Sequence, residues 1–174
     1  MTEAPTQAAR PAPAARGLFR HFETIATRWS DNDAYGHVNN VVYYSYFDTV
    51  VNRYLIEAGA LDIERSAVIG LVVETHCNYF ASLAFPQTIE AGLRVATLGS
   101  SSVRYEIGLF AAGEPLSAAW GHFVHVYVDR ETRRPVALSM AGGYGRVVED
   151  TVQVHLGTIR AAIESWRQWN NGAP

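Results

Sequence analysis

The sequence predicts one α+β domain in which a curved antiparallel β-sheet wraps a single long central helix, with a second helix at the C-terminal end. Three observations support this prediction. One segment has a helical pattern with a very wide apolar face, and four strand-like runs joined by short turns follow it. In addition, 48% of the 174 residues are hydrophobic, which is enough for a core of this size.

The N-terminal end differs in composition from the rest of the chain. Residues 1–16 contain six alanines and three prolines without a periodic apolar pattern, so we expect a disordered tail there. The single domain is then expected to span residues 17–174. Its first element is a strand at 18–29, rich in Phe, Ile, Thr and Trp, which ends at the turn-forming residues 30–33.

Residues 41–56 are expected to form the central helix. Eleven of these 16 positions are apolar or tyrosine, and so wide an apolar face is typical of an interior helix. The polar exceptions recur at spacings of three and four and form one narrow stripe, which consists of Ser45, Asp48, Thr49, Asn52 and Arg53. Asn39 or Asn40 can cap the start of the helix, and Gly59 can end it.

Four runs with strand character follow the helix, at residues 68–80, 88–98, 102–111 and 116–129. The short turns between them predict an antiparallel sheet. The third run alternates strictly, which places Val103, Tyr105, Ile107 and Leu109 on one face. The last run is long for a strand, so we expect strong curvature, with a bend at Gly121. A terminal helix is expected at 152–169.

Composition excludes several classes of function. Charged residues make up 18% of the chain and the net charge is −3, which disfavours binding to nucleic acid or to an anionic membrane. Cys77 is the only cysteine, so neither an intrachain disulfide nor a cysteine-rich zinc site can form. His122 and His125 are three residues apart on a strand and should point to opposite faces, so we expect no metal site. Without a secretory or membrane-spanning pattern, a cytoplasmic location is expected.

The segment at residues 28–46 concentrates the candidate functional groups. Asp31, Asp33 and His37 lie there at a junction between a strand and a helix. The start of a helix offers unpaired backbone N–H groups and a partial positive charge, which suit a carboxylate or a developing oxyanion. Gly36 has no Cβ and would let a substrate carbonyl approach those groups. The alternative is that Asp31, Asp33 and Asn39 only cap the helix.

The motif in this segment resembles the signature of the hotdog-fold acyl-CoA thioesterases of the 4-hydroxybenzoyl-CoA thioesterase type. The resemblance covers residues 22–138, and the residues that carry it are Asp31-x-Asp33-x-x-Gly36-His37-Val38-Asn39-Asn40-x-x-Tyr43 followed by Tyr46-Phe47-Asp48. It implies a hotdog fold and the hydrolysis of an acyl-CoA thioester to a free acid and CoA, without a cofactor.

The resemblance also implies roles for individual residues. Asp33 would be the catalytic carboxylate, acting as general base or nucleophile. Backbone N–H groups near Gly36, His37 and Val38 would form the oxyanion hole. The His37 side chain would bind the substrate carbonyl or orient Asp33, or have a purely structural role. Asp48 is a possible secondary acid, although it can equally belong to a hydrogen-bonded polar stripe at a subunit interface.

The substrate-binding candidates are Tyr43, Ser101, Ser102, Arg130, Arg133 and Arg134. The three arginines would pair with the phosphates of CoA at the surface, or else belong to a solvated turn. Two other functions on the same fold stay open, an enoyl-thioester hydratase and a nonenzymatic acyl-CoA-binding module. We also expect a homodimer or homotetramer, because one helix and one sheet leave an apolar helix face and an open sheet edge to cover.

Overall fold

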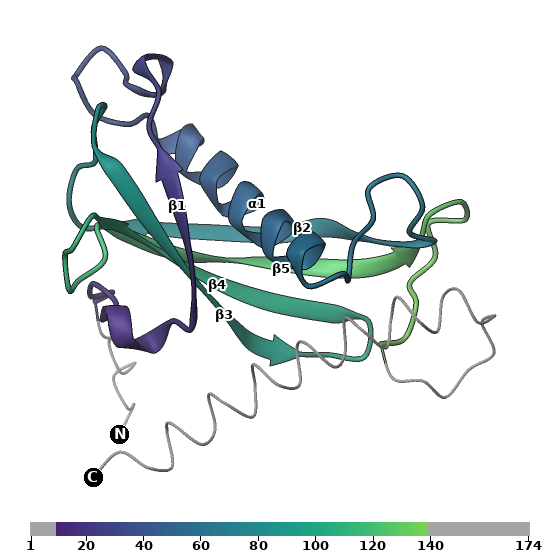
Figure 1. Cartoon of the computed structure of the whole chain (residues 1–174). Coiled ribbons are helices and arrows are strands. Elements are labelled where there is room, and N and C mark those ends of the chain that lie inside the picture. The colour runs from purple at the N-terminus through teal and green to yellow at the C-terminus, as the bar shows by residue number, and fades with distance from the viewer. Residues whose placement is uncertain (1–9, 139–174) are drawn as a thin grey trace, which may run out of the picture.

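The computed structural model describes residues 10–138, and in it one helix lies across one strongly curved sheet (Figure 1). The expected terminal helix at 152–169 falls outside the described residues. The elements in chain order are η1 (Arg16–Leu18), β1 (His21–Ala26), η2 (Trp29–Asp31), α1 (Asn40–Glu57), β2 (Val68–Tyr79), β3 (Thr88–Leu98), β4 (Ser102–Ala111) and β5 (Ala119–Asp129). The predicted architecture of a central helix and a curved antiparallel sheet is confirmed for this part of the chain.

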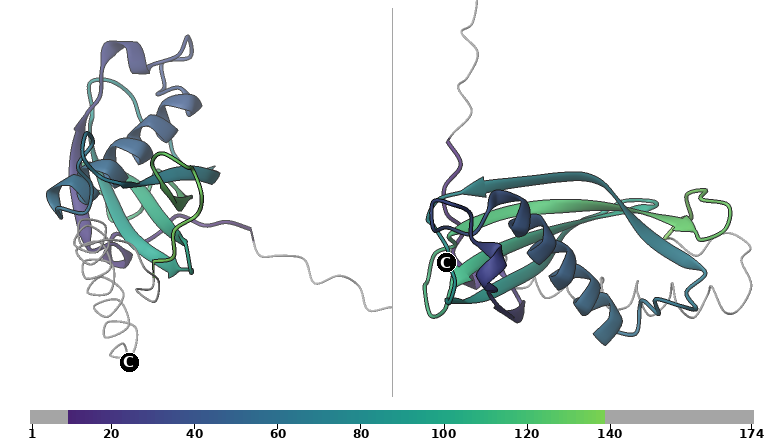
Figure 2. Two further views of the ribbon diagram at one scale, coloured as in Figure 1. Left: turned by 90° about the vertical axis from the view of Figure 1, so that its right-hand side faces the viewer. Right: turned by 90° about the horizontal axis from the view of Figure 1, so that it is seen from above.

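The five strands form one antiparallel sheet in the order β1-β3-β4-β5-β2, so β4 is central and β1 and β2 are the edges. Figure 2 shows the sheet curving around the helix. The register of β2 against β5 shifts between Val72 and Glu74, and that of β3 against β4 shifts between Val95 and Thr97. Such irregularities bend and twist strands, so they contribute to the curvature.

Helix α1 begins and ends as the sequence predicts, to within one residue. The Asn39 side chain accepts a hydrogen bond of 3.0 Å from the Val41 N–H, and Gly59 takes a φ of 70° just after the helix. The helix buries one face against the sheet, through Tyr43, Tyr46, Phe47, Val50, Val51 and Leu55. Its opposite face is exposed within this chain and includes most of the predicted polar stripe. Among residues 10–138 there is no helix long and apolar enough to cross a membrane.

The strand predictions hold best in the middle of the sheet. β3 and β4 match their predicted bounds, and the alternating residues of β4 are fully buried beneath the helix. β5 begins at Ala119 rather than at 116, and β1 is shorter than predicted at both ends. Gly121 has a different role from the predicted bend. A Cβ at this position would collide with the main chain of His76 on β2, so glycine permits the close approach of the two strands.

The expectation of a disordered tail is wrong for the end of that segment. Ala14 is buried and its N–H donates a 2.9 Å hydrogen bond to Ser117 Oγ. Arg16 forms an ion pair of 2.7 Å with Glu90. Just beyond, the Phe19 ring packs on the outer face of the sheet, where Ala14, Phe19 and Phe110 form a small second core. Backbone hydrogen bonds from the Arg16 N–H to the Pro115 carbonyl and from the Ser117 N–H to the Ala14 carbonyl also order this stretch, and composition does not reveal such bonds.

Candidate active site

Asp31 anchors the loop that leads from β1 into α1. Its side chain is 1% exposed and accepts hydrogen bonds of 2.7 Å from the Arg28 N–H and of 2.7 Å from the Tyr46 hydroxyl. The Arg28 guanidinium adds a bond of 2.9 Å from Nε. Burial alone would raise the pKa of Asp31, but these hydrogen bonds and the positive charge of Arg28 outweigh it and hold the pKa below its ordinary value. Asp31 is therefore an ionised, fully bonded structural residue.

Asp33 lies in a tight turn two residues later. Its Oδ1 accepts hydrogen bonds from the N–H groups of Tyr35, at 2.8 Å, and His37, at 3.4 Å. Gly36 has a φ of 81° in the left-handed region, and apart from its two chain neighbours no described residue has a heavy atom within 4 Å of the position of a Cβ there. The backbone conformation of the turn therefore requires this glycine. No partner for Asp33 Oδ2 is found among residues 10–138, so this half-buried carboxylate keeps one oxygen available.

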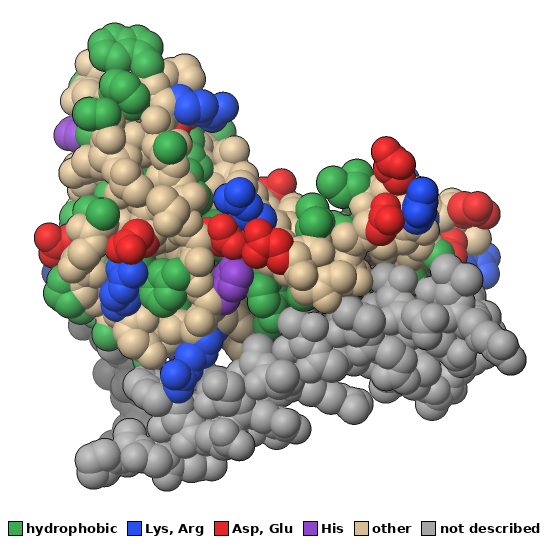
Figure 3. All heavy atoms as spheres, in the orientation of Figure 1, with side chains coloured by type: hydrophobic (Ala, Val, Ile, Leu, Met, Phe, Trp, Pro, Cys, Tyr) green, Lys and Arg blue, Asp and Glu red, His purple; other side chains and the backbone are tan. Residues whose placement is uncertain are grey.

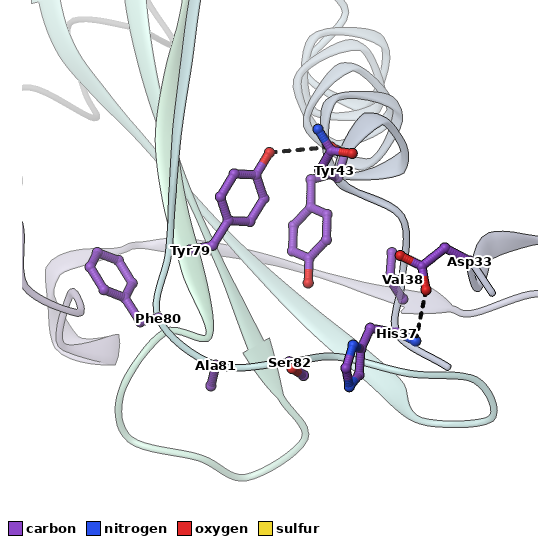
Figure 4. A pocket seen from close by; sticks show the side chains of 9 residues that line it. Asp33, His37, Val38, Tyr43, Tyr79, Phe80, Ala81 and Ser82 are labelled. Atoms are coloured by element: carbon purple, nitrogen blue, oxygen red, sulfur yellow. Dashed lines mark hydrogen bonds between the residues drawn. The ribbon is translucent and has the colours of Figure 1, made fainter. Parts of the chain in front are cut away.

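Asp33 faces a pocket of about 380 Å³ between the start of α1 and the segment that follows β2 (Figure 4). The residues that line it are Asp33, His37, Val38, Asn40, Tyr43, Tyr79, Phe80, Ala81 and Ser82. Tyr43 is almost fully buried and its ring meets that of Tyr79 edge-on, with centroids 5.0 Å apart. Burial raises the pKa of both tyrosines, so their hydroxyl groups stay protonated.

The predicted oxyanion donors are already engaged within the protein. The N–H groups of Gly36 and Val38 donate to the carbonyl oxygens of Asp33, at 3.1 Å, and Leu83, at 2.7 Å. The His37 N–H points to Asp33 Oδ1. These bonds hold the loop in shape but leave the three groups poorly placed to bind an oxyanion, which corrects the prediction.

Asn40 has an unpaired N–H among the described residues, a candidate donor that the sequence interpretation did not name. It is the first residue of α1, so its N–H has no acceptor within the helix, and none is found in the rest of the described chain. Asn40 also lines the pocket beside Asp33. The sequence contained the signal for this donor. If Asn39 is the cap, Asn40 is the first residue of the helix, and its N–H has no acceptor within the helix.

The His37 side chain is exposed at the rim of the same pocket. Its link to Asp33 runs through the main-chain N–H, and Figure 4 shows the ring turned away from the carboxylate. Of the roles considered for His37, orientation of Asp33 by the ring therefore lacks the necessary contact. A contact between the ring and a substrate carbonyl stays a prediction.

Asp48 lies outside the Asp33 pocket, on the exposed face of α1. Its carboxylate accepts a 3.0 Å hydrogen bond from Asn52 Nδ2, one helical turn further on. Within this chain Asp48 is therefore part of a hydrogen-bonded polar stripe, as in the alternative interpretation.

The remaining substrate-binding candidates, Ser101, Ser102, Arg130, Arg133 and Arg134, also lie outside this pocket. Ser101 is in the turn between β3 and β4, Ser102 is the first residue of β4, and the arginines lie after the end of β5. The Arg130 guanidinium donates to the carbonyl oxygens of Ser66, at 2.6 Å, and Ile63, at 2.8 Å, so it holds the segment before β2 in place. Among the six candidates, Tyr43 is the one that the structure brings to Asp33.

Two sets of residues were considered for metal binding. The predicted opposite orientation of His122 and His125 is confirmed, since His122 contacts Glu74 on the outer face and His125 is buried among the aromatic rings of the inner face. Potential ligand atoms of His21, Glu23 and Glu57 lie within 4.8 Å of one another. The guanidinium of Arg53 lies 3.4 Å from Glu23 and 3.7 Å from Glu57, however, and already offsets part of their negative charge.

Known proteins resemble this chain in sequence. The sequence model of the Thioesterase-like superfamily matches residues 27–153. The uncharacterized protein YsmA of Bacillus subtilis (strain 168) is 27% identical over 120 residues, which are 68% of this chain and 80% of YsmA.

Solved structures are similar over most of the chain. The PA5185 protein of Pseudomonas aeruginosa strain PAO1 is 54% identical, with a TM-score of 0.72 over 82% of this chain and 95% of that one. PA2801, a proposed thioesterase from Pseudomonas aeruginosa, is 28% identical, with a TM-score of 0.67 over 82% of this chain and 97% of that one. Together with the single helix on a five-stranded antiparallel sheet, these matches identify the hotdog fold.

Proposed function

Because this chain belongs to the thioesterase-like superfamily, we propose that it hydrolyses an acyl-CoA thioester to a free acid and CoA. Family membership supports thioester hydrolysis as the general reaction. One observation supports Asp33 as the catalytic group: Asp33 and Asn40 line the same pocket, and neither Asp33 Oδ2 nor the Asn40 N–H has a partner among residues 10–138. A base or nucleophile beside an oxyanion donor is the pair of groups that acyl transfer to water needs.

The reaction would proceed at the thioester carbonyl carbon. Asp33 takes a proton from water as the water oxygen attacks, or its carboxylate attacks directly, and each route gives a tetrahedral intermediate. In the second route a mixed anhydride forms only as the carbon–sulfur bond breaks, and water hydrolyses it after CoA has left. The Asn40 N–H, at the positive end of α1, stabilises the negative charge that develops on the carbonyl oxygen. The carbon–sulfur bond then breaks, and the thiolate of CoA takes up a proton. The acid retains an oxygen atom from water.

The walls of the pocket would hold the acyl group near the thioester. Tyr43 and Tyr79 present two perpendicular aromatic rings, and the Tyr79 hydroxyl donates a 3.2 Å hydrogen bond to the Asn40 carbonyl. That bond fixes the first turn of α1 against the wall. We propose that Tyr43 and Tyr79 contact the substrate while the Asn40 N–H stays aimed at its carbonyl.

A second copy of this chain is the proposed partner. Leu71, Val72 and Val73 on the edge strand β2 are 38%, 44% and 60% exposed, and an exposed apolar edge favours pairing with another strand. Figure 3 shows further hydrophobic side chains at the tip of the projection that leads into α1, where Trp29 and Tyr35 are more than four-fifths exposed. Light scattering should give at least a dimer, and a stable monomer at micromolar concentration would contradict this.

The proposed reaction is tested by the release of free thiol from a panel of acyl-CoA thioesters that differ in chain length and aromaticity. Release of thiol in step with free acid is expected for at least one member. A hydratase would consume an enoyl thioester without releasing thiol, and a binding module would bind substrate without turnover. Either result, obtained with well-folded protein across the whole panel, would contradict the proposal.

A further inference from the structure

A second pocket, of about 360 Å³, lies at the C-terminal end of α1 and shares no lining residue with the Asp33 pocket. An 18-residue helix is roughly 27 Å long, so the two pockets are well separated within one chain. Side chains from the last turns of α1, the segment after it, the start of β2 and the end of β5 form the wall. Most of them are aliphatic, among them Leu55, Ile56 and Val68. An apolar wall favours an apolar ligand.

The wall also contains polar side chains, those of Asn52, His125, Tyr127 and Arg130, and among them His125 has a distinct environment. It is 2% exposed, and neither Nδ1 nor Nε2 has a hydrogen-bond partner among the described residues. Burial lowers the pKa of His125 to about 4, so the ring is neutral at pH 7 and offers one N–H donor and one acceptor. The neighbouring hydroxyls of Tyr105 and Tyr127 bond to each other at 2.6 Å. A buried polar group without a partner is costly, which makes His125 a candidate ligand contact.

Gly70 lets the backbone of β2 pack closely against this ring. A Cβ at position 70 would lie 2.8 Å from His125 Nδ1, so any side chain there would press on the nitrogen. Gly70 has no left-handed backbone conformation that would require glycine for another reason. The absence of a side chain at Gly70 therefore has a steric role beside His125 Nδ1.

We propose that this second pocket binds a small, uncharged, mainly apolar molecule through one hydroxyl or carbonyl group that hydrogen-bonds to His125. A neutral imidazole can both donate to and accept from such a group. A carboxylate is a poor match, because its charge would be desolvated against a mostly aliphatic wall, and the Arg130 guanidinium at the rim already donates to two carbonyl oxygens. The proposal is independent of the thioesterase reaction.

Phenol, toluene and benzoate are suitable probes, because they share one ring and differ in the polar group. Titration calorimetry should show phenol binding more tightly than toluene by about threefold to tenfold, the range for one net hydrogen bond. Benzoate should bind most weakly. In an NMR spectrum of the histidine ring nitrogens, phenol should shift the signals of His125. Equal affinities for phenol and toluene, tightest binding of benzoate, or unshifted His125 signals at saturating phenol would each overturn the proposal.

Variants separate a binding role of His125 from a packing role. His125→Leu keeps the volume but should abolish the preference for phenol over toluene, and His125→Gln should restore part of it. Gly70→Ala should weaken the binding of both probes. Asp33→Asn should bind phenol as the wild type does, which separates this site from the proposed reaction. If His125→Leu fails to fold, the ring-nitrogen spectrum of the wild type still decides the question, and a folded His125→Leu that keeps its preference for phenol would overturn the proposal.

Discussion

Asp31 and Asp33 are two residues apart in one loop, yet they differ in burial and in hydrogen-bond partners. Asp31 is buried and accepts hydrogen bonds from Arg28 and Tyr46 on both carboxylate oxygens. Asp33 is half-buried, uses Oδ1 to hold its own turn and keeps Oδ2 free of protein partners within the described residues. The comparison teaches that a carboxylate with all its acceptor positions filled stabilises the fold, whereas one with an open position beside an unpaired N–H is available for chemistry.

Asp33→Asn is expected to have the largest effect. The amide keeps an oxygen for the Tyr35 N–H but cannot take a proton from water, so kcat for thiol release should fall by roughly 10² to 10⁴ with KM within a few fold. The melting temperature should change little. Near-normal turnover by a folded Asp33→Asn protein would contradict a catalytic role for Asp33 and make His37 the next residue to test.

Asn40→Pro tests the partner of Asp33. Proline removes the N–H but suits the first position of a helix, and Asn39 already has the extended backbone, with ψ 138°, that a residue before proline requires. Loss of one oxyanion donor should lower kcat by roughly 10² to 10³. Asn40→Ala is the matched control, because it keeps the N–H and should remain active. If both variants were equally active, the Asn40 N–H would not be the oxyanion donor.

Asp31→Asn should affect stability instead. It leaves the Arg28 guanidinium and the Tyr46 hydroxyl facing a neutral amide, and the free energy of unfolding at pH 7 should fall by about 2 to 3 kcal/mol, measured by urea denaturation. Folded enzyme at saturating substrate should retain most of its kcat. A variant as stable as the wild type would show that the buried carboxylate is dispensable.

The depressed pKa of Asp31 gives this effect a pH dependence. The ionised carboxylate contributes stability above its unfolded pKa, near 4, and that contribution is lost as the pH falls through the lower folded pKa. The stability difference between wild type and Asp31→Asn should therefore be full at neutral pH and shrink below about pH 4. A difference that grew on acidification would contradict the assignment.

Asp48→Asn should have the smallest effect. Asp48 is exposed, and its bond to Asn52 lies within one helix, so stability should change by less than about 0.5 kcal/mol and kcat by less than about twofold. The variant also serves as a control for loss of one negative charge in Asp33→Asn. A large fall in kcat with folding intact would mean that a second carboxylate takes part in the reaction.

Much of the fold could be predicted because the relevant signals are local. The period of the apolar residues in α1, the alternation in β4 and the turn residues between strands are all visible in the sequence. The ordered stretch around Ala14 was missed because its stability comes from contacts with Ser117 and the outer face of the sheet, which are distant in sequence. A composition rule tests only whether a segment can form its own core.

The site was predicted in part for a similar reason. Asp33, His37 and Tyr43 belong to one short motif, so their proximity follows from the turn and the first turn of the helix. Which N–H groups are left without an acceptor could not be predicted, because it depends on partners such as the Leu83 carbonyl that binds the Val38 N–H. That partner comes from a segment more than forty residues away.

The central position of β4 has a consequence for amide hydrogen exchange. Both neighbours pair along its length, and Val103, Tyr105, Ile107 and Leu109 are fully buried. Its amides should therefore exchange only through global unfolding. Amides in the first turn of α1 and at the start of β2 should exchange through local opening, which requires less free energy. Both pockets lie in those outer regions, so ligands can enter and leave while the centre of the sheet stays closed.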